Sequence, residues 1–302
     1  MSAAASTTDT AAPRPLHRRR RIHPKQRFGR IVLHAIVTVA CLVWFTPILQ
    51  LLAAALRTNP DTAASGWWNI FVDPLITLDN FAAAATVMRL GSTVPATLAM
   101  SIPAVILTVL LAAYGGHALS RWDFRGKGIV YAALVGLMVV PPQVTLAPLV
   151  QLFSAVGLTG NPAAVWLWSL GFTLPFGVFL MRGYMASLPE ELIEAAKVDG
   201  ASELRVFFQI ILPLSAPILA SLGILQFLWT WNDLLTPLIF VGPASANAPI
   251  TLQLANLLQS QSGGATNLLS AGSLIAVLVP LIVIVSLQRY FVAGITAGAV
   301  KG

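Results

Sequence analysis

Six long apolar stretches, separated by short polar connectors, set the pattern of this chain of 302 residues. Each stretch is close to the roughly 20 residues that an α-helix needs to cross the hydrocarbon core of a membrane. The pattern therefore predicts an all-α integral membrane protein with six spans, at about 31–56, 93–118, 128–153, 163–182, 213–239 and 268–288.

The connectors and ends divide the rest of the chain into regions. Trp67 and Trp68 suit the membrane–water interface, and Asn80 to Leu90 is predicted as a short interfacial helix. The predicted regions are a disordered basic tail (1–30), the first span (31–56), a loop with the interfacial helix (57–92), a five-helix core (93–290) and a C-terminal tail (291–302).

Every predicted span contains proline. A proline inside a helix frees a carbonyl group, which only protein neighbours or water can satisfy at membrane depth. The pattern favours broken helices that line a cavity, and plain kinks packed against neighbouring helices are the alternative. The prolines are Pro47, Pro95, Pro103, Pro141, Pro142, Pro148, Pro175, Pro217, Pro237 and Pro280.

One connector, residues 187–212, is strongly charged and lies between the fourth and fifth predicted spans. Five of the eleven acidic residues of the chain fall between Glu190 and Glu203. Ser187 and Glu190 have the spacing of a capping box, which predicts a helix that starts there and ends near Asp199.

A second short helix is predicted directly after the first. Gly200 suits the left-handed backbone that ends a helix, and Ser202 can cap a helix that runs to about Leu212. Pro213 then opens the next apolar stretch. Helices this short are not stable alone in water, so the pair needs a partner surface. A plain solvated connector is the alternative.

Composition supports the membrane assignment and argues against an enzyme. The chain is 57% hydrophobic and only 10% charged, with a mean hydropathy of +0.79, whereas soluble domains carry about 25% charged residues. Cys41 is the single cysteine and the four histidines are scattered, so we predict no metal site. The chain has no Gly-x-x-x-x-Gly-Lys-Ser/Thr phosphate loop and no hydrolase motif, so we predict no catalysis in this chain.

The net charge of +7 is distributed as a topology signal rather than as a nucleic-acid patch. With six spans, both termini lie on one side of the membrane. That side holds 16 of the 18 basic residues, and only Arg57 and Arg89 fall on the other. Both termini and the charged connector are therefore predicted to be cytosolic.

The charged connector resembles the EAA loop of ABC importer permeases. The resemblance rests on Glu194-Ala195-Ala196, Asp199-Gly200-Ala201 and Leu212-Pro213 at their spacing. It implies a pair of coupling helices that dock into a cleft of a cytosolic ATPase. The implied ATPase-coupling residues are Glu194, Ala195, Ala196, Asp199, Gly200, Ala201, Leu212 and Pro213.

Other parts are similar to the carbohydrate-importing branch of that family. Trp231-Asn232-Asp233 followed by Pro237 resembles its WN(D/E)-x-x-x-P signature. Leu78, Asn80 and Phe81 resemble a Leu-x-Asn-Phe pattern of the family, and the C-terminal tail is similar to the ending of the smaller permease of maltose-type importers. The resemblance covers about 78–302, and Asn161-Pro162 departs from the pattern in an outer loop.

The resemblance implies a permease subunit of a sugar or oligosaccharide importer in a bacterial cell membrane. The implied partners are a second homologous permease, a cytosolic ATPase dimer that holds ATP and Mg²⁺, and an extracytoplasmic solute-binding protein. This chain itself would hold no cofactor. The alternatives are an ion-coupled secondary carrier, an importer permease for a non-sugar solute, and a membrane scaffold or enzyme. The absence of a chain of buried acids for a proton relay argues against the carrier.

Few polar side chains fall within the spans. Asp233 is the only acid there, and it is first interpreted as a structural and gating element. The pathway and gating candidates are Gln143, Gln226, Asn232 and Asp233. Trp166, Trp168, Trp229 and Trp231 lie at span ends, where interfacial anchoring is the more common role.

The last sizeable loop, residues 242–267, is rich in Ser, Ala, Gly, Asn and Gln. By analogy with the same branch, it would reach into the binding protein, and an ordinary re-entrant connector is the alternative. The contact candidates are Gln253, Asn256, Gln259 and Gln261.

Overall fold

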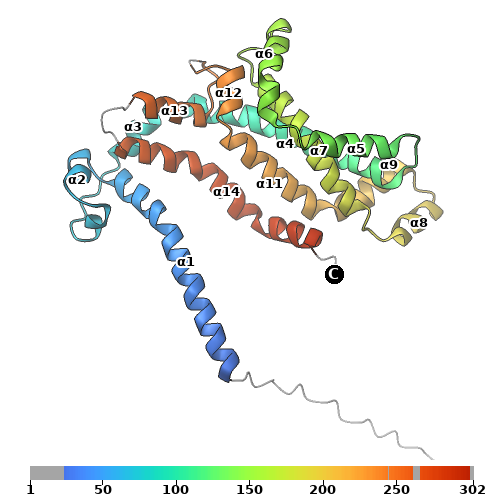
Figure 1. Cartoon of the computed structure of the whole chain (residues 1–302), viewed down its shortest axis with the longest axis horizontal. Coiled ribbons are helices and arrows are strands. Elements are labelled where there is room, and N and C mark those ends of the chain that lie inside the picture. The colour runs from blue at the N-terminus through green and yellow to red at the C-terminus, as the bar shows by residue number, and fades with distance from the viewer. Residues whose placement is uncertain (1–23, 244, 261–265, 300–302) are drawn as a thin grey trace, which may run out of the picture. The chain divides into compact units, whose positions relative to one another are not determined.

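The computed structural model describes residues 24–243, 245–260 and 266–299 (Figure 1). The chain divides into two compact units, residues 1–49 and 50–302. In the first unit, the described residues all belong to helix α1 (Pro24–Leu56). Its apolar side chains from Phe28 onward are largely exposed, as expected of a helix that faces lipid.

All regular elements among the described residues are helical. In the second unit they are α2 (Asn59–Ala64), η1 (Trp67–Phe71), α3 (Asp79–Val87), α4 (Leu90–Arg121), α5 (Lys127–Leu137), η2 (Pro142–Thr145), α6 (Leu146–Ala155), α7 (Pro162–Met185), α8 (Glu190–Val198), α9 (Glu203–Val206), η3 (Phe207–Ile211), α10 (Leu212–Leu214), α11 (Ala216–Asn232), α12 (Leu235–Phe240), α13 (Ile250–Ser260) and α14 (Thr266–Ala299). The all-α prediction is confirmed for the described residues, and α3 confirms the short helix expected near Asn80.

Four helices, α1, α4, α7 and α14, are long and apolar enough to cross a membrane unbroken. Two further candidates are bent pairs. One joins α5 to residues 142–155 with a bend of 94°, and the other joins residues 203–214 to α11 with a bend of 73°. The structure therefore has between four and six candidate spans among its described residues.

The predicted spans at 128–153 and 213–239 are both bent pairs of helices, in agreement with the broken helices that the prolines favour. The first breaks at Pro141 and Pro142, where two successive residues lack an N–H donor and Pro141 takes an extended backbone. The second is interrupted near Ser215 and again at Asp233, where α11 ends before α12 begins. Predicted helix ends also shift, since α14 runs on to Ala299, past its predicted end at 288.

Small residues bring α4 and α7 into close contact. A Cβ atom added to Gly116 would lie 2.5 Å from the Cβ of Met181, and one added to Gly177 would lie 2.8 Å from the Cβ of Ala112. Close backbone approach at small residues is the usual way for helices to associate in membranes, where apolar side chains gain little over lipid. These two helices form the frame to which α11 and the charged connector attach.

A second core cluster joins α11, α13 and α14. Trp231 is fully buried there, packs against Phe227, and donates its indole N–H to the carbonyl oxygen of Ala276 at 3.1 Å. The prediction that Trp231 anchors at the membrane interface is therefore wrong. A buried indole needs an acceptor for its N–H, and here the backbone of α14 supplies it.

Candidate functional site

The charged connector folds into two short helices, α8 and α9, joined by a tight turn. Gly200 adopts a left-handed backbone with φ of +80°, as predicted. The side chain of Ser202 caps α9 by accepting a hydrogen bond from the backbone N–H of Arg205 at 3.4 Å. Lys197 in α8 forms an ion pair with Glu203 in α9 at 2.6 Å, which ties the two helices together.

The predicted capping box is wrong. The hydroxyl of Ser187 donates instead to the carbonyl oxygen of Tyr184 at 2.7 Å and so closes the end of α7. Pro189 takes the position that precedes α8, without a side-chain cap. Helix α8 ends at Val198 as expected.

One face of the connector is packed against the membrane helices. Ile193 of α8 and Val206 of α9 are buried, in a cluster with Met181 and Met185 of α7 and Leu119 of α4. Residues 207–211 follow as one turn of π-helix, a form that often occurs at functional sites. Burial of these side chains gives the short helices the partner surface that they need.

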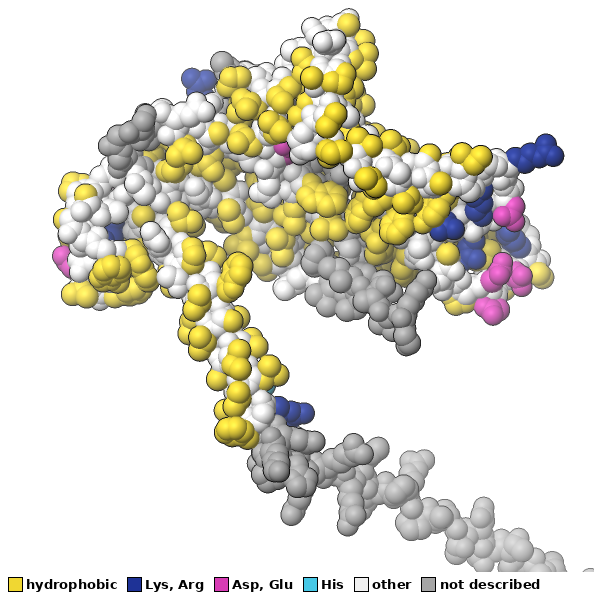
Figure 2. All heavy atoms as spheres, in the orientation of Figure 1, with side chains coloured by type: hydrophobic (Ala, Val, Ile, Leu, Met, Phe, Trp, Pro, Cys, Tyr) yellow, Lys and Arg dark blue, Asp and Glu magenta, His cyan; other side chains and the backbone are white. Residues whose placement is uncertain are grey.

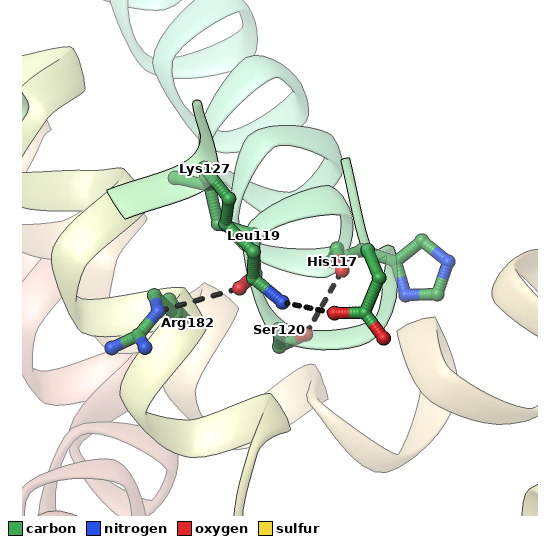
Figure 3. A network of polar contacts seen from close by, with 6 residues as sticks. His117, Leu119, Ser120, Lys127 and Arg182 are labelled. Carbon is green, nitrogen blue, oxygen red and sulfur yellow. Dashed lines mark hydrogen bonds and ion pairs between the residues drawn. The ribbon is translucent and has the colours of Figure 1, made fainter. Parts of the chain in front are cut away.

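Polar contacts at the end of α4 hold the start of the connector. Arg121 donates from Nη2 to the carbonyl oxygens of Met185 at 2.7 Å and Leu188 at 3.0 Å. Figure 3 shows the neighbouring contacts, in which Nε of Arg182 donates to the carbonyl oxygen of Leu119 at 3.4 Å. Because these cations satisfy carbonyl groups at helix ends, they fix where the connector leaves the helices.

The opposite face of the connector is exposed. Basic and acidic side chains gather over α8 and α9, beside largely hydrophobic surface (Figure 2). Of the predicted coupling residues, Glu194, Ala195, Asp199, Gly200 and Pro213 are exposed, whereas Ala196, Ala201 and Leu212 are half-buried against the core. Val198 is 87% exposed and Leu192 is 49% exposed, so apolar side chains accompany the charges on this face. A mixed surface of this kind is suited to bind a protein partner.

A cavity of about 560 Å³ lies between the η2 turn, α7 and α11. Its lining residues are Pro142, Gln143, Trp168, Ser169, Phe172, Thr173, Leu228, Trp229, Thr230, Asn232 and Asp233. Three of the four predicted pathway residues, Gln143, Asn232 and Asp233, belong to this lining. Sequence reasoning missed the aromatic and hydroxyl members, whose side chains meet only in the folded chain.

The fourth predicted pathway residue, Gln226, is not part of the lining. It is fully buried, and its amide donates to the hydroxyl oxygens of Ser169 at 2.7 Å and Thr230 at 3.0 Å. Its carbonyl oxygen has no hydrogen-bond partner within the described residues. Gln226 therefore positions two hydroxyl groups of the cavity wall from behind.

Asp233 lies at the break between α11 and α12. Its Oδ1 accepts a hydrogen bond from the backbone N–H of Thr236 at 3.2 Å, and its carbonyl oxygen accepts one from the hydroxyl of Thr251 at 2.8 Å. The first bond caps α12 and the second ties the break to α13. The neighbouring Asn232 also borders a second cavity of about 400 Å³ on the side of α13.

The last loop contains α13, which is fixed to α4 by a hydrogen bond from the N–H of Ile250 to the hydroxyl of Thr97 at 2.9 Å. Among the predicted binding-protein contacts, Gln253 and Asn256 are half-buried and Gln259 is exposed. Asn256 donates to the carbonyl oxygen of Pro243 at 3.1 Å. Gln261 lies outside the described residues.

Within the part of the chain that the structure describes, His, Cys, Asp and Glu side chains form no group of three that could hold a metal ion.

Comparison with known proteins identifies relatives over most of the chain. Residues 81–297 match the family described as binding-protein-dependent transport system inner membrane component. The osmoprotective compounds uptake permease protein GgtD of Synechocystis is 40% identical over 276 residues, which cover 90% of this chain and 92% of that protein. The alpha-glucoside transport system permease protein AglG of Rhizobium meliloti is 44% identical over 76% of this chain and 61% of its own length.

The fold is also that of a solved transporter. A chain in the crystal structure of a bacterial ABC transporter involved in the import of the acidic polysaccharide alginate superimposes with a TM-score of 0.72. The match covers 89% of this chain and 99% of that chain, at 20% sequence identity. At this identity the likeness concerns the fold alone.

Proposed function

The chain belongs to the family of binding-protein-dependent transport system inner membrane components, and we propose that it is the transmembrane permease subunit of an ABC importer for sugars or related polyhydroxylated solutes. It would form half of the pathway, beside a second homologous permease. The observation that carries the proposal is the α8–Gly200–α9 turn, which is packed against the membrane helices on one face and exposed on the other.

The α8–α9 turn is suited to receive force from an ATPase dimer. Its exposed face carries Glu194, which has no ion-pair partner among the described residues and so is available to a basic side chain of the ATPase. The chain lacks a phosphate loop, so ATP and Mg²⁺ would be held by that separate subunit. This chain would itself be no enzyme.

The solute class is supported by the names of the relatives and by the cavity. GgtD is named for osmoprotective compounds and AglG for alpha-glucosides. The cavity combines aromatic side chains with hydroxyl and amide groups, which is the lining that a polyhydroxylated solute requires. The family's description includes a binding protein, and α13 with Gln253, Asn256 and Gln259 is the surface that we propose for it.

We also propose six spans, with the α8–α9 turn and both termini in the cytosol of a bacterial cell. The distribution of basic residues supports this orientation, since 16 of 18 then lie inside. It would bring α8 and α9 within reach of the ATPase.

The test is to reconstitute the chain in proteoliposomes together with the second permease, the ATPase and the binding protein that we propose as its partners. We expect ATP-dependent uptake of a labelled sugar, ATPase activity that the loaded binding protein stimulates, and loss of both when Glu194, Asp199 and the turn are replaced by a Gly-Ser linker. Uptake that survives without ATP but collapses with the proton gradient would select an ion-coupled carrier. ATP-dependent uptake of non-sugar solutes alone would keep the importer and reject the sugar.

A further inference from the structure

We propose that a pocket between the C-terminal end of α1, α2 and the start of α14 binds the phosphate headgroup of an anionic phospholipid, with Arg57 as the residue that holds the anion. This pocket, called the Arg57 pocket below, lies within the second unit and shares no lining residue with the cavity between η2, α7 and α11. Its volume of about 260 Å³ is below the range of roughly 300–1,000 Å³ that is typical of drug-sized ligands, which suits a headgroup.

Arg57 is fixed at the wall of the pocket by three hydrogen bonds. It follows the last residue of α1 directly and is only 3% exposed. Nη1 donates to the carbonyl oxygen of Gly66 at 3.0 Å. Nη2 donates to the carbonyl oxygen of Asp61 at 2.9 Å and to the hydroxyl of Ser65 at 2.6 Å. These neutral acceptors orient the guanidinium but do not cancel its charge, and arginine is rarely buried without an anion beside it.

The positive charge of Arg57 has no counter-ion within the described residues. Arg57 takes part in neither ion pair of this part of the chain, and its Nε atom has no hydrogen-bond partner there. The carboxylate of Asp61 accepts a hydrogen bond from the hydroxyl of Thr58 instead. Because a buried charge without a partner is costly, the pocket is suited to take up an anion from outside the chain.

A phosphate group fits this arrangement. The planar guanidinium presents its N–H donors in a geometry that matches phosphate oxygens. Trp67 and Thr266 also line the pocket, and their side-chain donors have no hydrogen-bond partner among the described residues. The lining contains no Asp or Glu, so the ammonium group of phosphatidylethanolamine would find no anion there. We therefore expect a headgroup with a net negative charge, such as that of phosphatidylglycerol.

The surface beside the pocket indicates that the phosphate belongs to a lipid. The pocket lies where the candidate span Phe28–Leu56 ends, which is at the boundary of the hydrocarbon core. Tryptophan at this level and exposed apolar side chains next to it are typical of a segment that contacts acyl chains. A soluble phosphate would gain nothing from such a surface. The apolar side chains that are more than half exposed in this segment are Trp68, Phe71, Val72, Leu75 and Ile76.

The experiment measures which lipids the full-length permease retains. The chain is extracted from nanodiscs of mixed phosphatidylglycerol and phosphatidylethanolamine, and native mass spectrometry identifies the bound lipids. We expect the wild type to retain phosphatidylglycerol in preference, and Arg57→Gln to retain about tenfold less, because a charge-assisted contact is lost. Arg89→Gln removes the same charge from an exposed position outside the pocket lining, so it is the matched control and should retain as much as the wild type.

A second variant is needed because Arg57→Gln also removes hydrogen bonds within the fold. Thr266→Phe places a ring at the exposed start of α14, on the wall of the pocket, and leaves the three bonds of Arg57 in place. We expect it to lower the retained phosphatidylglycerol at least threefold. Phosphatidylglycerol added to phosphatidylcholine nanodiscs should raise the thermal midpoint of the wild type and of Arg89→Gln, but not that of Thr266→Phe.

The outcomes distinguish the possible anions and do not depend on solute transport, since no solute or ATPase is present. Equal retention of phosphatidylglycerol by the wild type, Arg57→Gln and Thr266→Phe overturns the site. Equal retention of phosphatidylethanolamine and phosphatidylglycerol by the wild type overturns the selection by charge. Displacement of the lipid by excess inorganic phosphate would assign the pocket to a soluble phosphate. Loss of the lipid when the second permease is added would assign Arg57 to an acidic group of that subunit, and either result overturns the lipid.

Discussion

At the scale of single residues, the α8–α9 turn depends on the backbone of Gly200. A Cβ atom at this position would meet nothing within 4 Å, so a substitution there is opposed by the φ of +80° and not by crowding. The left-handed conformation costs a residue other than glycine roughly 1–2 kcal/mol, and asparagine tolerates it best.

We therefore expect Gly200→Ala to reduce the ATPase retained on tagged permease by on the order of fivefold to thirtyfold, the ratio that ~1–2 kcal/mol corresponds to. Gly200→Asn is the matched control and should retain most of it. Equal retention by the two variants would contradict the role of the left-handed turn.

Arg121 is the second residue on which the connector depends. Its guanidinium satisfies the carbonyl groups of Met185 and Leu188, where α7 ends and the connector begins. Hydrogen bonds to a charged donor contribute about 1.5–3 kcal/mol, more than neutral ones.

Arg121→Met should therefore lower the thermal midpoint of the purified permease by several degrees and weaken ATPase retention. Arg125→Met is the control in the loop that follows α4, since Arg125 is exposed and has no hydrogen bond or ion pair among the described residues. A midpoint that falls equally in both variants would show that charge alone, and not these bonds, matters.

At the scale of helices, the contact of α4 with α7 depends on Gly116. An added Cβ atom would lie 2.5 Å from the Cβ of Met181 and 2.8 Å from the backbone nitrogen of Arg182, and neither atom can move without the helix. Gly116→Ala should therefore destabilise the permease by about 1–3 kcal/mol, as overpacking does.

Gly171→Ala, in the same pair of helices, is the control. An added Cβ atom there meets nothing within 4 Å, and removal of a helical glycine should be neutral or stabilising by about 0.5–1 kcal/mol. Denaturant midpoints in nanodiscs should thus move in opposite directions. A loss of stability at both positions would contradict the close contact.

Helix boundaries could be predicted from the sequence where a residue's own backbone or side chain sets them, and could not where contacts with other helices set them. Gly200 and Ser202 act through their own backbone and side chain, so their turn and cap could be predicted. Broken helices could be predicted from the prolines, but the positions of the breaks could not, because α4 and α7 continue through internal prolines, whereas the adjacent prolines Pro141 and Pro142 end a helix.

The residues that line the cavity could likewise be predicted only in part. Asn232 and Asp233 are predicted because they are polar residues within an apolar span, and both line the cavity. Trp168, Trp229 and Trp231 have the same local pattern but different surroundings, since two line the cavity and the third is buried against α14. Only tertiary contacts separate these roles, and no periodicity in the sequence records them.

At the scale of the second unit, one continuous stretch joins the two proposed sites. It leaves the α8–α9 turn through the π-helical turn at 207–211, bends by 73° near Ser215, and continues as α11 to Thr230 in the cavity wall. A movement of the turn by an ATPase would therefore reach the cavity along one continuous segment, formed by residues 207–214 and α11. This arrangement requires the turn and the outer end of α11 to face opposite sides of the membrane.

The proposed orientation of the whole molecule rests on its charge distribution and gives the last prediction. With Cys41 replaced by serine, single cysteines are placed at Glu191 in α8 and at Asp73 in the first loop, both of which are exposed. In intact cells, a membrane-impermeant maleimide should label Asp73→Cys and spare Glu191→Cys, and permeabilisation should expose the second to the same extent. The charged reagent does not cross the bilayer, because moving a charge through the hydrocarbon core is too costly. Labelling of Glu191→Cys in intact cells would therefore contradict the proposed topology, and with it the proposed contact between α8 and the ATPase.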